Sequence, residues 1–477
     1  MAERRGDFAN ALALDRRAAS LIDTLRAQQG AETQSIAVLG RRLFAFEALI
    51  HLLGRLEPRY PDSGYAAESF QWAERARARA FLDLLEGAAA RTGGVPATAA
   101  PVRTLSLKDA RAQLDSDREA LLEYSVGDSS TSLWVITRRG ARHLLLPPRA
   151  ALRARAEIFR RGLGDPSGAE RRSTLNASRA LYRALIEPAE ADLAGVSRLI
   201  VSADDALALI PFEALLTSDV LAENAVPAPG SYLVERFTVS YVPSVTVLAS
   251  LRPASKVGVV VALGDPRFGA DPDSAAGPAL APLPNTAAEV TSLRALAGSR
   301  RFVALTGADA TRVRLLALPE LYQAGLIHLA THGVADENEP GRSGLWLAPD
   351  VTPSGPPAGP GFLSMDDVLG LNLRSELVTL SACETGLGRL ERGEGVLGLT
   401  RAFLVAGARS VVVSLWRVND RSTAQLMEGF YRALLQRGMD REQALAEAKR
   451  ALLAASETRS PYYWAPFVMV GEGGKLK

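Results

Sequence analysis

Three stretches of the chain differ in the spacing of their apolar side chains. In residues 1–90 apolar positions recur three and four residues apart, which is the period of an amphipathic helix. This spacing predicts helices over 8–28, 34–56 and 65–86, with a break at the Pro-Asp-Ser-Gly turn of residues 61–64. From residue 120 onward short apolar runs alternate with turn residues, so the remainder contains strands as well as helices.

The N-terminal segment, residues 1–90, is similar to a tetratricopeptide (TPR) unit. Antiparallel helices joined by a short turn fit such a unit, but no complete 34-residue repeat is visible, and a plain helical cap is the alternative interpretation. Because an incomplete repeat array needs a surface to stack on, we expect this segment to pack on the next domain or on a partner protein. Residues 91–102 are rich in Gly, Ala, Pro and Thr, which predicts a linker.

Residues 103–255 mix strands and helices. Strands are predicted at 121–126, 133–137, 143–146, 198–202 and 239–242, and helices at 150–163, 175–193 and 211–216. This order predicts an α+β unit. It contains no cysteine, so its expected role is to bind or to brace and not to perform thiol chemistry.

Residues 256–477 alternate strand and helix, as in folds with a parallel sheet. Strands are predicted at 257–263, 302–305, 326–330, 345–348, 377–380, 411–415 and 467–470. Helices are predicted at 285–296, 311–318, 396–406, 421–436 and 441–454, with another beginning at 364. The pattern predicts helices packed on a sheet of about six strands.

Two of these strands lead into residues that can perform chemistry. The strand at 377–380 leads into Ser-Ala-Cys-Glu-Thr-Gly, which contains Cys383, the only cysteine of the chain. The strand at 326–330 leads to His332, followed by Gly333. Open α/β sheets bind ligands at the carboxyl ends of their strands, and a thiol beside an imidazole forms a nucleophile–base pair. The alternative is that Cys383 is a small buried hydrophobic residue, as lone cysteines commonly are.

Chain order separates the candidate classes of hydrolase. The four histidines all precede Cys383; they are His51, His143, His328 and His332. In α/β-hydrolases the histidine follows the nucleophile, and in papain-like enzymes it follows the cysteine, so both orders are excluded. Caspases place the histidine about 50 residues upstream of the cysteine, and here the separation is 383 − 332 = 51.

Four motifs together resemble the CHAT domain. They are His-Gly at 332–333, Ser-Ala-Cys-Glu-Thr-Gly at 381–386, Gly-Val-Leu-Gly-Leu-Thr-Arg-Ala-Phe at 395–403 and Ser-Leu-Trp-Arg-Val-Asn-Asp at 414–420. CHAT domains are caspase-like peptidase domains of bacteria, related to caspases and separases and often joined to TPR repeats. The resemblance covers roughly residues 103–471. It implies an α/β fold: a caspase-like three-layer sandwich with a mostly parallel sheet in residues 256–477, preceded by an α+β, pseudo-peptidase-like companion half in residues 103–255.

The resemblance also implies roles for individual residues. Cys383 is the expected nucleophile and His332 the expected proton acceptor and donor. The backbone N–H groups of Gly333 and Cys383 are the expected oxyanion donors, and Gly333 has no Cβ to block a close approach.

Five further residues are candidates for substrate binding: Ser381, Glu384, Asp366, Asp367 and Asp420. Asp366 and Asp367 lie where a helix begins, so capping is the alternative role, and the same alternative applies to Asp420. Related peptidases with basic specificity place an Asp two residues before the cysteine, where this chain has Ser381, so the resemblance does not extend to basic specificity. Glu384 follows the cysteine as in the family.

No metal or cofactor is expected. His328 and His332 are four residues apart, but the metalloprotease motif requires Glu after the first histidine, and a strand does not place the two rings on one face as a helix would. His328 is therefore interpreted as a packed strand residue. The chain also lacks the Gly-x-x-x-x-Gly-Lys-Ser/Thr motif of nucleotide hydrolysis.

Charge and composition restrict the expected partners. The formal net charge is +2, from 55 basic and 53 acidic residues, which gives no electrostatic reason to expect nucleic acid or an anionic membrane. No run approaches 18 apolar residues and the N-terminus lacks the apolar core of a secretory signal, so no membrane association is expected and a cytoplasmic location is predicted.

Together these features predict a cysteine endopeptidase that cleaves protein substrates with a Cys383/His332 dyad. We expect it to be regulated, with an activating protein partner binding the N-terminal helices. The alternative is a non-catalytic protein-interaction scaffold of the same fold.

Overall fold

The chain begins with helices, as the apolar spacing predicts. They are α1 (Phe8–Gln29), α3 (Phe44–Leu56) and α4 (Tyr65–Arg91). This computed structural model describes residues 6–29, 44–91, 104–219, 227–251, 254, 256–268, 280–334, 343–350, 361–381, 389–391 and 395–477. The first ten residues of the helix predicted at 34–56 lie outside the described residues.

The companion half combines strands with helices. Its elements are α5 (Leu107–Ala112), β1 (Glu119–Val126), β2 (Thr131–Thr137), β3 (Ala141–Leu146), α6 (Arg149–Leu163), α7 (Arg171–Leu185), β4 (Arg198–Ser202), α8 (Leu233–Arg236), β5 (Thr238–Tyr241) and α9 (Val245–Ser250), with 3₁₀ turns η4 (Glu187–Ala189), η5 (Asp205–Leu209) and η6 (Phe212–Ala214). The helix predicted to extend to residue 193 ends at Leu185. Pro188, inside that range, lacks the N–H that a continuing helix needs, and it lies in η4.

The second half alternates strands and helices. Its elements are β6 (Val259–Pro266), α10 (Pro284–Leu296), β7 (Arg301–Gly307), α11 (Arg312–Ala317), β8 (Leu326–Ala330), β9 (His332–Val334), β10 (Gly344–Leu347), β11 (Gly361–Ser364), α12 (Met365–Leu369), β12 (Leu377–Ser381), β13 (Arg389–Glu391), β14 (Gly395–Leu397), α13 (Leu399–Ala406), β15 (Ser410–Ser414), α14 (Asp420–Tyr431), α15 (Arg441–Ala454), α16 (Pro461–Trp464) and β16 (Phe467–Gly471). The helix predicted from residue 396 starts at Leu399, because residues 395–397 pair with β13.

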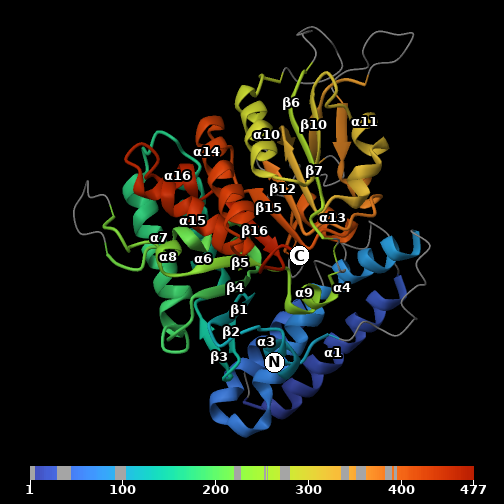
Figure 1. Cartoon of the computed structure of the whole chain (residues 1–477). Helices are drawn as coiled ribbons and strands as arrows, with labels where there is room; N and C mark the ends of the chain where they lie inside the picture. The colour runs from blue at the N-terminus through green and yellow to red at the C-terminus, as the bar shows by residue number, and fades with distance from the viewer. Residues whose placement is uncertain are drawn as a thin grey trace.

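One large sheet passes through both halves (Figure 1). Among the described residues it has eleven strands, in the order β3-β2-β1-β4-β5-β16-β15-β12-β8-β6-β7. Seven of its ten pairings are parallel, and the antiparallel ones join β1 to β2, β2 to β3 and β15 to β16. The mostly parallel sheet with helices is therefore confirmed, and the second half supplies six of the eleven strands.

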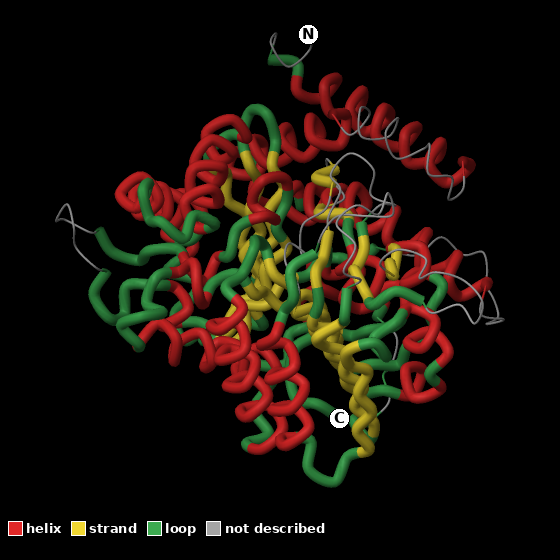
Figure 2. Tube along the Cα trace, turned by 90° about the horizontal axis from the view of Figure 1, so that it is seen from above, coloured by secondary structure: helices red, strands yellow, loops and turns green. Residues whose placement is uncertain are grey.

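Helices cover both faces of the sheet, which forms a twisted band through the molecule in Figure 2. The central strands β8 and β12 are buried at every residue, as expected for parallel strands covered on both sides. Helices α10 and α14 pack together, and so do α12 and α13. Thr379 of β12 is in register with Val412 of β15, so Ser381 and Val412 face one side of the sheet and Val413 faces the other. A contact from α10 reaches Ser381, whereas α13 lines a pocket with Val413. Because alternate residues of a strand face opposite sides, the two helix pairs lie on opposite faces.

The two halves meet where β5 pairs with β16, through Tyr241 and Val470. A buried ion pair also crosses this junction: Lys449 Nζ on α15 donates to Glu213 Oε1 of η6 at 2.6 Å. The division into residues 103–255 and 256–477 stays a prediction, but the sheet between these ranges is continuous.

The N-terminal helices pack on the companion half, below the large sheet in Figure 1. Their apolar side chains form one cluster with Trp134 and Ile136 of β2. Polar contacts add to it: Trp134 Nε1 donates to the Ala66 carbonyl at 3.1 Å, and the buried Arg77 of α4 donates to Ser202 Oγ at 2.7 Å. The surface on which this segment was expected to stack is therefore the next part of the same chain.

Candidate active site

The candidate dyad belongs to two neighbouring strands. β8 and β12 run parallel, with Ser381 opposite Ala330, so their carboxyl ends lie at the same edge of the sheet. His332 follows β8 after one residue and begins β9. Ser381 is the last residue of β12; Cys383 and Glu384, two of the predicted site residues, lie outside the described residues.

His332 is half-buried and tied to a backbone carbonyl. Its Nε2 lies 2.7 Å from the Ala281 oxygen, and its ring centroid lies 5.3 Å from that of Phe268. A carbonyl oxygen only accepts hydrogen bonds, so Nε2 must carry the proton, and Nδ1 of the neutral ring remains as the acceptor. The geometry thus determines which nitrogen is able to take a proton from a nucleophile.

Gly333, the predicted oxyanion donor, lies beside His332 in β9. Its partner in the antiparallel pairing with β10 is Leu345, and the partner of His332 is Trp346. A second small sheet, β11-β10-β9, therefore supports the histidine and the glycine together. The role of Gly333 as an oxyanion donor stays a prediction.

Helix α10 and the residues just before it contact three of the predicted site residues. The Ala281 carbonyl bonds His332, and Asn285 donates to Asp420 Oδ2 from its side-chain nitrogen at 2.6 Å and from its backbone N–H at 3.2 Å. Glu289 accepts the Ser381 hydroxyl at 2.7 Å. Ala281, Asn285 and Glu289 are four residues apart from one another, so one segment of the chain contacts residues of β9, α14 and β12. No motif in the sequence indicates that α10 belongs to the site.

A buried polar cluster lies beneath this edge of the sheet. His328, in register with Thr379 of β12, has no solvent exposure; its Nε2 lies 3.2 Å from Glu289 Oε2 and its Nδ1 lies 2.9 Å from the Tyr431 hydroxyl. Burial raises the pKa of Tyr431, so the phenol keeps its proton. His328 is thus packed within a strand, as interpreted, but inside a polar network and not an apolar one. The signal available in the sequence was polar residues at positions 328, 379 and 381 of otherwise apolar strands.

Asp366 and Asp367 lie at the start of α12. Ser364 Oγ accepts the Asp367 N–H, and the Asp367 carboxylate accepts the Ser364 N–H, which completes a capping box. The Arg312 guanidinium also pairs with Asp367 and, with these hydrogen bonds, lowers the pKa of that carboxyl to about 2. The geometry accounts for Asp367 as a cap; substrate binding by either aspartate stays a prediction.

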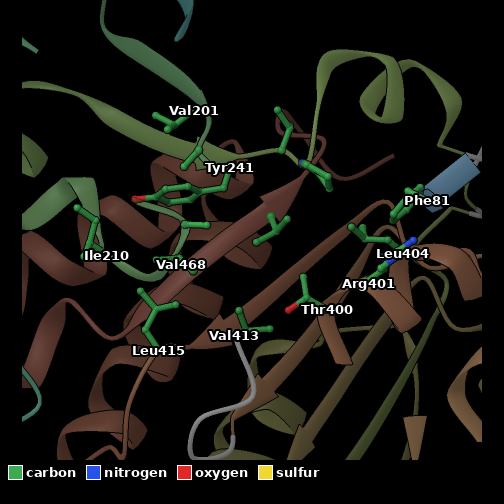
Figure 3. Close-up of a pocket in the computed structure, with 15 residues that line it drawn as sticks. Phe81, Val201, Ile210, Tyr241, Thr400, Arg401, Leu404, Val413, Leu415 and Val468 are labelled. Carbon is green, nitrogen blue, oxygen red and sulfur yellow. The ribbon is translucent and has the colours of Figure 1, made fainter. Parts of the chain in front are cut away.

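An apolar pocket lies at the junction of the halves, on the face covered by α13 (Figure 3). Its volume is about 90 Å³. The lining comes from β4, β5, β15, β16, α13, the η5 region and α4: Phe81, Val201, Ala203, Ala208, Ile210, Tyr241, Val242, Pro243, Thr400, Arg401, Leu404, Val413, Leu415, Val468 and Val470. Arg401 lies over the Phe81 ring, 5.8 Å from its centroid, which connects α13 to the N-terminal helices. The residues that contact His332 and Ser381 lie on other elements.

The described residues contain no group of three or more His, Cys, Asp or Glu side chains arranged to bind a metal ion. No helix in the described part of the chain has the length and apolar character needed to cross a membrane.

The mixed sheet with helices on both faces, and a histidine and a cysteine following adjacent parallel strands, define the class of caspase-like proteins. Residues 175–472 match the CHAT domain, and the chain belongs to that family. The resemblance found in the sequence is thereby confirmed.

Comparisons with known proteins agree with this class. The chain is 29% identical over 346 residues to tetratricopeptide repeat protein 28 of Mus musculus, and 29% identical over 343 residues to the same protein of Homo sapiens. Each match covers 62% of this chain and 13% of the relative, so the chain corresponds to a small part of those proteins. A chain in the structure of the Saccharomyces cerevisiae separase–securin complex is similar over 98% of this chain and 38% of its own length, with a TM-score of 0.56 at 11% identity. At that identity the likeness shows the fold alone.

Proposed function

We propose that this chain is a cysteine endopeptidase in which Cys383 is the nucleophile and His332 its base. The observation that carries the proposal is the parallel pairing of β8 and β12, because their carboxyl ends lead to these two residues on adjacent strands. Membership of the CHAT family and the caspase-like fold support it. A nucleophile beside a positioned base is the arrangement that covalent catalysis requires.

The reaction follows from these positions. His332 takes the thiol proton, and the Cys383 sulfur forms a bond to the scissile carbonyl carbon while the carbonyl electrons move to oxygen. The N–H groups of Gly333 and Cys383 donate to that oxyanion. When the C–N bond breaks, the leaving amine takes the proton from His332; water, deprotonated by His332, then hydrolyses the thioester and restores the thiol.

The tautomer of His332 supports this assignment. Since Nε2 donates to Ala281, Nδ1 is the basic nitrogen that would face the nucleophile. We therefore expect Nδ1 to take the thiol proton and the Ala281 carbonyl to stabilise the imidazolium.

Ser381, Glu384, Asp366, Asp367 and Asp420 remain the proposed substrate-binding residues. Ser381, Asp367 and Asp420 each also have a partner within the chain: Glu289, Arg312 and Asn285. A substrate that used one of these side chains would have to share or replace that contact. We infer protein substrates from the reaction class alone.

We also propose that a protein partner regulates the enzyme through α1. Leu14 and Leu21, seven residues apart on α1, are 56% and 57% exposed, so they offer apolar surface on the outermost helix. Changing both to Ser is expected to abolish activation by cell lysate while leaving basal cleavage unchanged. The cytoplasm, predicted from the sequence, is the proposed location.

The primary test uses purified chain and fluorogenic peptides that differ only in the residue before the cut. Wild type is expected to cleave some of them, and Cys383→Ala and His332→Ala are expected to lose at least a hundredfold in kcat/KM. A silent wild type is retested with lysate as a source of activator. A folded protein that remains silent there, or variants as active as wild type, would favour the interaction scaffold.

A further inference from the structure

We propose that Glu289 is a positioning residue for the candidate nucleophile. It accepts the hydroxyl of Ser381 at 2.7 Å, and Ser381 is the last residue of β12, two positions before Cys383. This bond fixes the end of β12, from which the sequence continues to Cys383 two residues later. The positioning role rests on the proposed peptidase function, but it concerns a residue of α10 that carries no sequence motif.

The environment of Glu289 supports a role beyond packing. Its side chain is 1% exposed, and a buried carboxylate is costly unless it is hydrogen-bonded or paired with a charge. Ser381 and the His328 ring both approach Oε2, and among the described residues Oε1 has no hydrogen-bond partner. An apolar side chain here would pack without this cost, so the carboxylate is explained by the contacts it makes to β8 and β12.

The same segment contacts the other side of the dyad. The Ala281 carbonyl orients His332, and Glu289 binds Ser381, which precedes Cys383. Glu289 lies on α10, and helices hold side-chain positions better than loops do; Ala281 lies three residues before the helix begins. One continuous segment is therefore linked both to His332 and to the strand that leads to Cys383.

The groups facing Glu289 define which substitutions isolate the Ser381 contact. They are His328 from β8, Ser381 from β12 and, through His328, Tyr431 from α14. Ser381→Ala removes the hydroxyl and leaves the carboxylate, whereas Ser381→Thr keeps a hydroxyl. Glu289→Ala removes the acceptor, and Glu289→Gln keeps an acceptor oxygen.

Because Cys383 is the only cysteine, its alkylation rate by iodoacetamide reports on the site without requiring peptidase activity. The rate constant is measured on the full chain at a pH above the thiol transition, beside kcat/KM on a cleaved peptide. We expect Ser381→Ala and Glu289→Ala each to change the alkylation rate about tenfold and to lower kcat. Ser381→Thr and Glu289→Gln should stay within about twofold of wild type, because each keeps the hydrogen bond.

The double variant Ser381→Ala/Glu289→Ala decides whether the two residues act as a unit. We expect its alkylation rate to match that of either single variant, since one bond is lost in all three. Val290→Ala is the matched control: it shortens a buried side chain of the same helix, which is 5% exposed, without touching the network, and should leave the rate unchanged.

Additive effects in the double variant, an equal effect of Val290→Ala, or no effect of Ser381→Ala would overturn the proposal. If Glu289→Ala does not fold, the comparison of Ser381→Ala with Ser381→Thr still tests it. Changed alkylation in the variants, together with a wild type that cleaves no peptide with or without lysate, would support the positioning role and contradict the proposed function, so the two failures are distinguishable.

Discussion

Asp367 is a candidate for substrate binding by sequence, but in the structure its contacts are those of a helix cap. Asp366 and Asp367, which follow Ser364, are compatible with substrate binding and with helix capping. Only the positions of Ser364 and Arg312 distinguish these two roles for Asp367. Both groups contact the Asp367 carboxylate. The stability of the start of α12 is therefore the first property that a substitution at this residue is expected to change.

Asp367→Ala is expected to lower the free energy of unfolding by about 1–2 kcal/mol, which combines the lost cap with the lost, partly solvent-screened Arg312 pair. The carboxyl pKa is about 2 in the folded chain against 3.8 as the ordinary value. A depressed folded pKa stabilises the fold above pH 3.8, and this stabilisation is lost as the pH falls towards 2. The difference between wild type and variant in urea unfolding should therefore shrink by about half between pH 7 and pH 3.

Asp366→Ala is the control for this measurement, because that side chain has no part in the capping box. A loss in Asp366→Ala equal to that in Asp367→Ala would contradict the assignment. A loss in Asp367→Ala that does not change with pH would contradict the ionised state of the carboxyl.

At the scale of elements, the contact between α3 and β3 depends on a neutral histidine. His143 packs against Trp134 with ring centroids 5.3 Å apart, and a Cβ added at Gly54 would meet its Cε1 at 2.7 Å. Burial lowers the pKa of His143 to about 4. The N-terminal helices thus lie on a group that resists protonation in the folded state.

This predicts acid-sensitive docking of α3. Below pH about 6.5 the unfolded chain protonates His143 while the folded chain does not until about pH 4, so stability falls across this window as pH decreases. Between pH 7.5 and pH 5 the loss due to His143 is expected to be about 1–2 kcal/mol. His143→Phe should remove that part of the pH dependence in urea unfolding, and an unchanged pH dependence would contradict the prediction.

The elements that carry the candidate site were largely predictable, because buried parallel strands are short apolar runs with turn residues at their ends. The predicted strand 326–330 agrees with β8, and 377–380 agrees with β12 to within one residue. What the sequence did not indicate were contacts between distant segments. The bond from Glu289 to Ser381 joins residues 92 apart, and the bond from Asn285 to Asp420 joins residues 135 apart; no local spacing encodes either.

At the scale of the whole molecule, the pocket at the junction of the halves leaves apolar space beside buried strands. Val413→Ile adds one methylene into this space and is expected to raise the free energy of unfolding by up to about 0.8 kcal/mol. Val378→Ile on β12, fully buried and not part of the pocket lining, is the control and should destabilise by about 1–3 kcal/mol through overpacking. Destabilisation by Val413→Ile comparable to that control would show that the pocket is closed in solution.

The continuous sheet predicts that the two halves unfold together, and Lys449 provides the test. Its ammonium and the Glu213 carboxylate are 1% and 2% exposed, and burial lowers the pKa of Lys449 while Glu213 opposes that shift. The Tyr241 hydroxyl donates to the other oxygen of Glu213, so the pair joins α15 to the strand that meets β16. Lys449→Met leaves the carboxylate buried without a cation and is expected to cost about 3–5 kcal/mol.

Adding Glu213→Gln to Lys449→Met should restore much of this loss, because the uncompensated charge is then gone while the amide still accepts from Tyr241. Tryptophan fluorescence and far-UV circular dichroism should give coincident unfolding curves in wild type and in both variants, since the lost pair joins α15 of one half to η6 of the other and the sheet runs through both. Two separated transitions would mean that residues 103–255 and 256–477 are independent folding units despite the β5–β16 pairing. A single transition that shifts as a whole with Lys449→Met would instead mean that the two halves form one cooperative folding unit. A partner that binds the companion half or the N-terminal helices would then act on the same unit that contains His332.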